Sequence, residues 1–408
     1  MKNYKIIKKC RLCLGVNLKT SFDLGKSPLC YHYVKKKYKQ IFFPLKLLLC
    51  SDCGLSQINC VVDKNYIYEA KSPITLGKHF CKYADSVLKK TNLKKKDLIL
   101  DIGSNNGMLL KEFKKKNYKI LGVESNRVVA KIANQNGLTT INAFFDKKLV
   151  KKITLTYQKP KIITINHLFA NIDNLHEFSN NLCALIHEYG TIVIETSYIG
   201  DIFKNNIFDW IYHEHLSYFS INPLKSFFEK KSFKLYDIDV SDSKGGSIRY
   251  YFTNKKNDFP ITKLVKDFSN YEKKNKMNSL STFRKFKNRI DIKKKKVYSL
   301  LDKLNEMTIV GYGASATTTT LLSYFGIYKF FKYLIDDNPE KNGLYSPGYH
   351  IPVFSSKIFK DDPPEVIVIL AWRYKDIILK NLKILKKKYK IKKLSVIVPL
   401  PSIKLYNL

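Results

Sequence analysis

Arginine is scarce in this chain: it supplies six of the 73 basic residues, and lysine supplies the rest. Proteins that read nucleic acids use arginine for bidentate contacts to phosphates and base edges. The scarcity therefore argues against a dedicated nucleic-acid-binding protein, although the formal net charge is +39. We interpret the scattered lysine runs mainly as solvated faces that also attract an anionic substrate such as a nucleotide diphosphate. A non-catalytic protein that binds anionic polymers is the alternative that charge alone favours.

Long apolar runs are also missing. The longest, such as residues 366–372, have the length of a strand and are far too short to span a bilayer. The first ten residues contain lysines throughout, where a secretory signal would have an apolar run. The sequence predicts no membrane segment and a cytoplasmic location.

Cysteine is nearly absent from the C-terminal four fifths of the chain, since seven of the eight cysteines precede residue 82. Two CxxC pairs stand in this region, Cys10 with Cys13 and Cys50 with Cys53. Each pair can place two thiolates on one tetrahedral Zn²⁺, and four thiolates leave no position for water. The pattern predicts a structural zinc site. Buried free cysteines or a redox CxxC are the alternatives.

Strand and helix signals alternate after the cysteine-rich segment, which predicts an α/β fold with a parallel, doubly wound sheet. Polar, lysine-rich residues from about 260 to 306 suit long connecting helices, and a second series of strand signals follows. We predict three domains, a zinc-binding module (1–80), a central domain (81–255) and a C-terminal Rossmann-like domain with its helical linker (256–408). We expect strands at 98–102, 120–124, 162–166, 191–196, 308–310, 331–336 and 366–371. We expect helices at 83–90 and 108–115.

A glycine-rich turn follows the first strand of the central domain. It reads Asp101-Ile-Gly103-Ser-Asn105-Asn-Gly107, and Glu124 ends the next strand about 20 residues later. Glycine lets the backbone approach a cofactor closely, and an acid at the second position can accept hydrogen bonds from the ribose hydroxyls of an adenosine. The turn is not GxGxxG, which weakens a dinucleotide interpretation. These residues are the predicted S-adenosylmethionine site.

A second concentration of titratable residues lies at 212–215. Tyr212, His213, Glu214 and His215 are consecutive. An extended backbone would separate Tyr212 and Glu214 from the two histidines, so a bend is needed to bring Tyr212, Glu214 and His215 to one pocket. HEH lacks the spacing of HExxH, which disfavours a second metal site. We predict that His215 is a general base, that Glu214 orients it or raises its basicity, and that Tyr212 holds a substrate oxygen. A satisfied structural network is the alternative.

Nearly the whole chain resembles the zinc-containing sugar C-methyltransferases of deoxysugar and surface-polysaccharide pathways. The likeness rests on the paired CxxC, the IGSNNG turn and above all the IYHEHLSYFS block. It extends to Tyr66-Ile-Tyr68, Gly245-Gly-Ser-Ile-Arg249, Gly311-Tyr-Gly-Ala314 and residues 345–352. The resemblance implies a Rossmann-like class I methyltransferase core between a zinc module and a C-terminal Rossmann-like module, with the substrate cleft between them.

The resemblance also implies a reaction. A ketone at C4 of a nucleotide-linked deoxysugar acidifies the C3–H, His215 removes that proton, and the enolate takes the methyl group. Tyr212 and Glu214 match the family's supporting groups. A methyltransferase acting on oxygen or nitrogen of another metabolite is the alternative.

The chain departs from the family's usual residues at five positions. Two of them, Thr317 and Arg373, fall in the module expected to grip the nucleotide, where Lys and Asn are usual, and Arg373 is expected to replace the lost phosphate contact. The other three are Asn106 in place of Asp, Asn171 in place of His and Lys244 in place of His.

Overall fold

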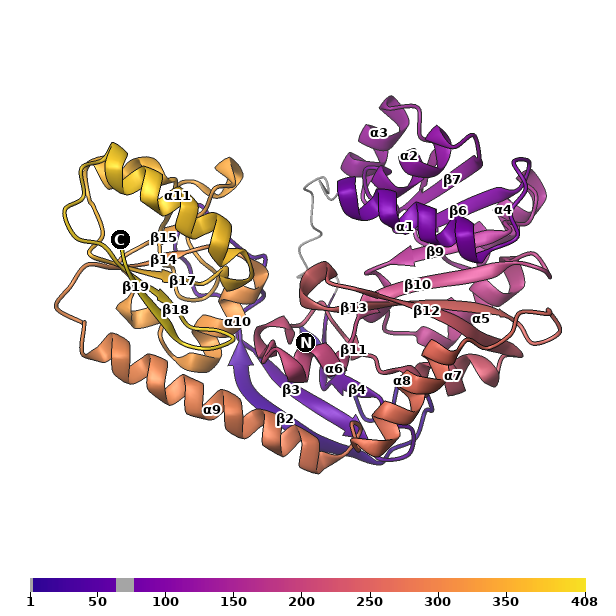
Figure 1. Cartoon of the computed structure of the whole chain (residues 1–408), viewed down its shortest axis with the longest axis horizontal. Coiled ribbons are helices and arrows are strands. Elements are labelled where there is room, and N and C mark those ends of the chain that lie inside the picture. The colour runs from indigo at the N-terminus through magenta and orange to yellow at the C-terminus, as the bar shows by residue number, and fades with distance from the viewer. Residues whose placement is uncertain (1–2, 64–76) are drawn as a thin grey trace.

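A computed structural model describes residues 3–63 and 77–408. Figure 1 shows two lobes, joined along one side by a long helix and by strands from the N-terminal part of the chain. None of the described helices is long and apolar enough to cross a membrane. The family-like stretch at 66–68 lies outside the described residues.

The larger lobe is built on a seven-stranded sheet. Its strands, in spatial order, are β12 (Phe233–Ser241), β13 (Ser247–Asn254), β10 (Thr191–Ser197), β9 (Ile162–Asn166), β6 (Leu98–Ile102), β7 (Lys119–Glu124) and β8 (Thr140–Asn142). The five strands from β10 to β8 are parallel, and β13 runs antiparallel to both of its neighbours. β6 and β9 are buried along nearly their whole length, as expected for central strands covered on both faces.

Helices cover both faces of this sheet. On one face, α1 and α2 pack Tyr83 and Phe113 against Ile99 and Val193 of the sheet. On the other face, α4 and α5 contribute Ile153 and other apolar residues to the main core. The helices of this lobe are α1 (Gly77–Lys90), α2 (Met108–Lys115), α3 (Arg127–Gln135), α4 (Lys147–Thr156), α5 (Leu175–Leu185), α6 (Ile199–Lys204) and α7 (Ile221–Glu229).

The N-terminal part forms two small antiparallel sheets. β1 (Tyr4–Ile6) pairs with β5 (Cys60–Val62), and β2 (Leu18–Ser27), β3 (Phe43–Cys50) and β4 (Ser56–Ile58) form a meander. The meander takes its fourth strand, β11 (Ser217–Tyr218), from the larger lobe. The two parts of the chain therefore share one sheet.

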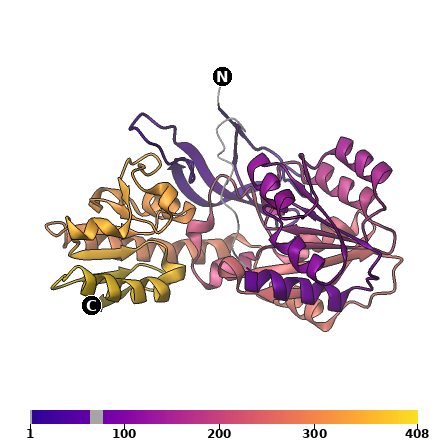
Figure 2. The same ribbon diagram turned by 90° about the horizontal axis from the view of Figure 1, so that it is seen from above.

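The smaller lobe is the C-terminal α/β unit. α8 (Lys263–Lys274) and the 23-residue α9 (Leu280–Asp302) lead to it, and Figures 1 and 2 show α9 passing from one lobe to the other. The strands of its sheet, in spatial order, are β16 (Val353–Phe354), β15 (Leu334–Ile335), β14 (Ile309–Tyr312), β17 (Val366–Ile369), β18 (Ser395–Val398) and β19 (Lys404–Asn407). All are parallel except β19, and α10 (Ala316–Phe325) and α11 (Lys375–Lys388) pack on the sheet.

The fold class predicted from the sequence is confirmed. β6, β9 and α2 have the bounds that their patterns predicted, and α8 and α9 occupy the lysine-rich connection. The patterns missed the first turns of α1 and the antiparallel β12–β13 hairpin. The three-domain division remains our proposal, because the shared strand β11 ties the first two units together.

Candidate active site and zinc centre

Two cysteine-containing turns meet in the N-terminal part of the chain. The Sγ atoms of Cys10, Cys13, Cys50 and Cys53 all lie within 4.8 Å of one another. Cys10 lies 3.5 Å from Cys53, and Cys13 lies 3.5 Å from Cys50, measured between sulfurs. Tetrahedral Zn²⁺ with Zn–S bonds of about 2.3 Å places its sulfurs about 3.8 Å apart. The donor set therefore fits a closed, structural zinc site.

The two turns share one backbone geometry. The amide of Leu14 donates to the Cys10 carbonyl at 3.0 Å, and the amide of Gly54 donates to the Cys50 carbonyl at 2.9 Å. Both donors have left-handed φ, 64° at Leu14 and 80° at Gly54. Each turn thus folds its two thiols to the same side, as one metal ion requires.

The zinc module is attached to the segment that follows the predicted catalytic block. β4 pairs with β11, with Gln57 opposite Ser217. The buried Arg11 donates to the carbonyls of Ile58 at 3.2 Å and Leu216 at 3.3 Å, which adds to the pairing. Since β11 begins two residues after His215, the module that carries the four cysteines supports the position of that histidine.

The glycine-rich turn lies at the carboxyl ends of β6 and β7. Gly103 and Gly107 have φ of 75° and 77°. A Cβ at Gly103 would come within 2.9 Å of Leu168, and one at Gly107 within 2.6 Å of Leu138. The close approach and the left-handed backbone both require glycine at these positions.

Glu124 closes the turn from the neighbouring strand. Its two carboxylate oxygens accept the backbone amides of Asn105 at 2.9 Å and Asn126 at 2.8 Å. Each oxygen keeps a further lone pair, so a ribose can still donate to this carboxylate. Asp101 differs, because it is buried and accepts the Thr164 hydroxyl at 2.7 Å, and burial raises its pKa to about 7. The position of Asp101 fits support of the turn better than direct contact with a cofactor.

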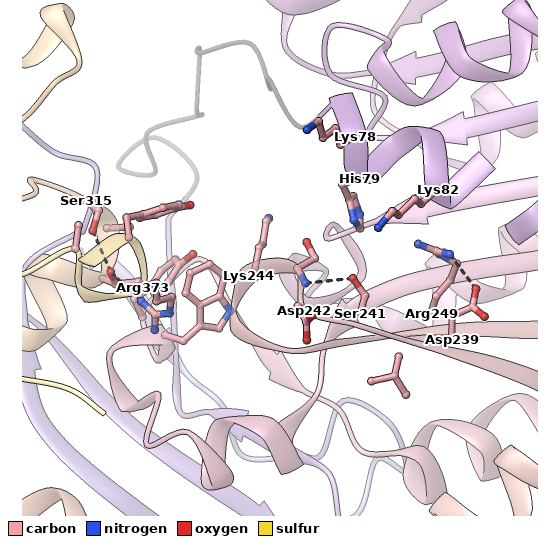
Figure 3. Close-up of a pocket in the computed structure, with 18 of the residues that line it drawn as sticks. Lys78, His79, Lys82, Asp239, Ser241, Asp242, Lys244, Arg249, Ser315 and Arg373 are labelled. Atoms are coloured by element: carbon pink, nitrogen blue, oxygen red, sulfur yellow. Dashed lines mark hydrogen bonds and ion pairs between the residues drawn. The ribbon is translucent and has the colours of Figure 1, made fainter. Parts of the chain in front are cut away.

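The main cavity, of about 920 Å³, lies between the two lobes. Lys78, His79 and Lys82 of α1 point into it from one side, and Arg373 stands on the opposite side (Figure 3). Lys244, in the turn between β12 and β13, lies between them (Figure 3). Cations therefore predominate over the acids Asp239 and Asp242 in its lining. Other residues that line it are Tyr31, Trp210, Tyr212, Arg249, Ser315, Thr317 and Lys341.

The predicted catalytic block bends as expected. The His215 amide donates to the Tyr212 carbonyl at 3.1 Å, which closes a turn. The Tyr212 hydroxyl lies 3.0 Å from His215 Nε2, and the two rings stack with centroids 4.3 Å apart. Tyr212 lines the main cavity, whereas the buried His215 lies behind it beside Trp210.

His215 also lines a second, narrow space. Its other walls include His167, Trp210 and Ser217. His167 follows the carboxyl end of β9, and its neighbour Leu168 packs on Gly103 of the glycine turn. The glycine turn itself lines neither space.

The structure does not bring Glu214 to His215. Both Glu214 carboxylate oxygens are buried, and neither has a hydrogen-bond partner within 3–63 and 77–408. Burial raises the pKa of Glu214 to about 7, and its charge acts on Cys30 and Tyr31, on the zinc-module side. His213 points into the zinc module, where its Nε2 lies 3.3 Å from the Pro44 carbonyl oxygen.

The sequence interpretation missed a buried charge network beside the cavity. Glu195, in the middle of the sheet, forms an ion pair with Arg249 at 2.6 Å and lies 2.8 Å from His79 and 3.4 Å from His167. These partners hold the Glu195 pKa well below its usual range against the effect of burial. A glutamate inside the apolar strand 191–197 was the signal available in the sequence.

The family departures have different environments. Lys244 has left-handed φ (53°) and projects into the cavity, and Thr317 lines the cavity beside Arg373. Asn171 is exposed at the end of a short 3₁₀ turn (Phe169–Asn171), and the Asn106 amide donates to Asn105 Oδ1. Three of the five departures, Lys244, Thr317 and Arg373, therefore lie in the cavity wall.

Comparison with known proteins supplies the reaction class. Sequence models of three domain families match in succession, namely a zinc binding domain (10–68), a methyltransferase domain (77–238) and the C-methyltransferase C-terminal domain (242–401). Over 388 residues the chain is 27% identical to the C-methyltransferase NovU of Streptomyces niveus, with 92% of each protein covered. The chain is an S-adenosylmethionine-dependent C-methyltransferase. The predicted cofactors, S-adenosylmethionine and zinc, are confirmed, and carbon is favoured over oxygen or nitrogen as the acceptor atom.

Solved structures show more distant likeness. Magnesium protoporphyrin IX methyltransferase of Synechocystis PCC 6803 with bound SAM is 7% identical, covering 43% of this chain and 77% of that one at a TM-score of 0.33. The YcgJ protein of Bacillus is 11% identical, covering 44% and 100% at a TM-score of 0.35. Neither likeness bears on the substrate.

Proposed function

We propose that this C-methyltransferase methylates C3 of a nucleotide-linked 4-keto-deoxysugar in the cytoplasm, with His215 as the base. The observation that carries the proposal is the cavity between the lobes, which has Tyr212 in its wall and His215 directly behind. Its volume of about 920 Å³ suits a ligand of nucleotide-sugar size. A base that removes a proton from carbon is needed for methylation at carbon, whereas methylation of oxygen or nitrogen does not need one.

The charge of the cavity supports an anionic substrate. Lys78, Lys82 and Lys244 line it, and none of them has an ion-pair partner in the part of the chain that the structure describes. Lysines without carboxylate partners attract a diphosphate, and low-dielectric walls strengthen that attraction. A neutral acceptor would make no use of this lining.

The protonation state of His215 supports its role as a base. Burial lowers the His215 pKa well below its usual range, and the charges of Lys244 and His167 act in the same direction. The ring also hydrogen-bonds the backbone of Trp210. Because Nε2 faces Tyr212, that bond places the ring proton on Nδ1, so Nε2 accepts the hydrogen bond of the Tyr212 hydroxyl and can take up its proton.

We propose that Tyr212 and His215 act together. Tyr212 reaches the cavity, so its hydroxyl oxygen takes the C3 proton from the substrate as its own proton passes to His215 Nε2, and the C3–H bond electrons form the enolate. Glu214, which lies away from His215, keeps the wall beside Tyr31 acidic in place of orienting the base. S-Adenosylmethionine, when bound between the glycine turn and Glu124, supplies an electrophilic methyl group to the enolate carbon.

The test uses thymidine- and uridine-diphospho 4-keto-6-deoxysugars as acceptors. The expected product shows a new C–CH₃ signal by NMR, and without S-adenosylmethionine the enzyme exchanges the C3 proton with solvent deuterium. An O–CH₃ product, or methyl transfer without C3 exchange in D₂O, would reject the proposed function.

The cofactor site yields a separate prediction. Glu124→Ala should weaken S-adenosylmethionine binding about 10- to 100-fold, because a charge-assisted hydrogen bond to ribose is worth about 1.5–3 kcal/mol. Isothermal titration with the cofactor measures this. Asp146→Ala is the matched control, since Asp146 also accepts a backbone amide, at the start of α4 on the far face of the sheet. Equal cofactor affinity in the Glu124 variant and the wild type would reject the assignment.

A further inference from the structure

Arg373 was expected to be a free phosphate ligand, yet its guanidinium is already engaged. Nη2 donates to Asp209 Oδ1 at 2.7 Å, and Nη1 donates to Asp209 Oδ2 at 3.2 Å. Asp209 is completely buried and also accepts the indole N–H of Trp372 at 2.9 Å. A fork-to-carboxylate pair of this kind fixes both side chains and neutralises the cation.

The Arg373–Asp209 pair joins three parts of the molecule. Arg373 belongs to the smaller lobe, in the 3₁₀ turn Trp372–Tyr374, and Asp209 to the larger lobe, in the 3₁₀ turn Phe208–Trp210. The third part is the turn that carries Lys244, because a Cβ on Gly245 would lie 3.4 Å from Arg373 Nε. The Arg373 side chain thus lies against both the Asp209 turn and the Lys244 turn of the larger lobe.

The Arg373–Asp209 pair lies next to the part of the cavity wall that Trp210 and Tyr212 form. The Arg373 guanidinium lies 5.3 Å from the Trp210 ring centroid, and Trp210 in turn contacts the rings of Tyr212 and His215. Asp209 precedes Tyr212 by three residues. A shift of the smaller lobe at this point would therefore move the Trp210–Tyr212 wall.

We propose that Arg373 is a positioning residue, which locks the smaller lobe onto Asp209 and so fixes Trp210 and Tyr212 against the acceptor. The inference rests on methyl transfer and on the geometry, and it holds for any acceptor that enters this cavity. It also replaces the expectation that Arg373 binds phosphate directly.

Intrinsic fluorescence provides a test that needs no acceptor. The chain has two tryptophans, Trp210 and Trp372, and both contact Arg373. Arg373→Gln should move the emission to longer wavelength, because the loosened junction admits water, while cofactor affinity stays at the wild-type value. Lys332→Ala is the control, since Lys332 forms an exposed ion pair with Asp362 in the same lobe. Emission unchanged in Arg373→Gln would overturn the proposal.

The kinetics of Asp209→Asn distinguish a positioning role of Arg373 from direct phosphate binding, because the two roles predict opposite effects on activity toward the acceptor. If Arg373 positions the wall, Asp209→Asn and Arg373→Gln should each lower kcat/KM by on the order of 10²-fold, as small displacements of reacting groups do. The double variant should be no worse than either single one, because both remove the same contact. If Arg373 binds phosphate, Asp209→Asn frees its charge and lowers the acceptor KM, which overturns the proposal.

The double variant also controls for folding, since Arg373→Gln alone leaves a buried carboxylate without its cation. Asp209→Asn with Arg373→Gln removes both charges and keeps an acceptor for the Trp372 indole. It should melt close to the wild type yet retain the kinetic loss; wild-type kinetics in this folded variant would overturn the proposal. A wild-type enzyme inactive on the sugars above would reject only the proposed function, because the emission test does not involve them.

Discussion

Cys50→Ser is expected to abolish methyl transfer together with zinc binding. Binding of structural Zn²⁺ contributes about 10–16 kcal/mol in small zinc-finger peptides at pH 7, so loss of the ion would remove a free energy comparable with the whole stability of a typical domain. The damage should reach the active site, because β3 ends at Cys50 and β4 then pairs with β11, next to His215. Zinc content by mass spectrometry, the melting temperature and the methylation rate should all fall together.

Cys183→Ser is the matched control for the zinc prediction. Cys183 is a partly buried cysteine of α5, and it lies outside the four-sulfur cluster. Its replacement should leave the zinc content at one ion per chain and the methylation rate near that of the wild type. A Cys50→Ser protein that loses zinc yet turns over normally would contradict the support that we assign to the zinc module.

The sequence was most informative where a pattern and its structure are both local. β6, α2 and β9 could be predicted to the residue because apolar runs, a glycine turn and helical spacing all act within a few positions. The four metal-ligating cysteines could be predicted equally well, because CxxC spacing is typical of a turn that holds a metal ion. Such features depend little on what the rest of the chain does.

The candidate site was less predictable because it depends on contacts between distant segments. The bend at Tyr212 could be anticipated, but the charge of Glu214 acts on Tyr31, about 180 residues earlier in the chain, and no local pattern indicates that proximity. Arg373 was predicted to be available for a phosphate because its partner, Asp209, lies 164 residues away in the sequence. Glu195 carried a signal, a charge in an apolar strand, yet its partners His79 and Arg249 come from two other elements.

These long-range contacts also suggest how the parts of the enzyme cooperate. The zinc module pairs with the segment from Asp209 to Tyr218 through β11, near the end of that segment. The smaller lobe contacts the start of the same segment through the bond from Arg373 to Asp209. The methyltransferase sheet contributes the cofactor turn. The segment from Asp209 to Tyr218 is therefore the point at which all three units meet.

His215→Ala is expected to lower kcat by about 10²–10⁴-fold, the usual contribution of a general base. Cofactor affinity should hardly change, because the glycine turn does not line the space that His215 lines. Exchange of the C3 proton with solvent deuterium should stop as well. His213→Ala is the control: it removes a second buried histidine, which faces the zinc module, so the folded variant should keep its kcat.

The pH profile of kcat tests the role of His215 independently. Because burial lowers the His215 pKa in the folded protein, the neutral base persists below the usual histidine value of 6.5. The acid limb of the kcat profile should therefore lie below pH 6.5, and activity should be lost only as the pH falls toward the lowered pKa. The same histidine binds its proton more readily when unfolded, so its contribution to stability is complete above pH 6.5 and declines as the pH falls. Full turnover in His215→Ala, or an acid limb above pH 7 in the wild type, would contradict the assignment of His215 as the base.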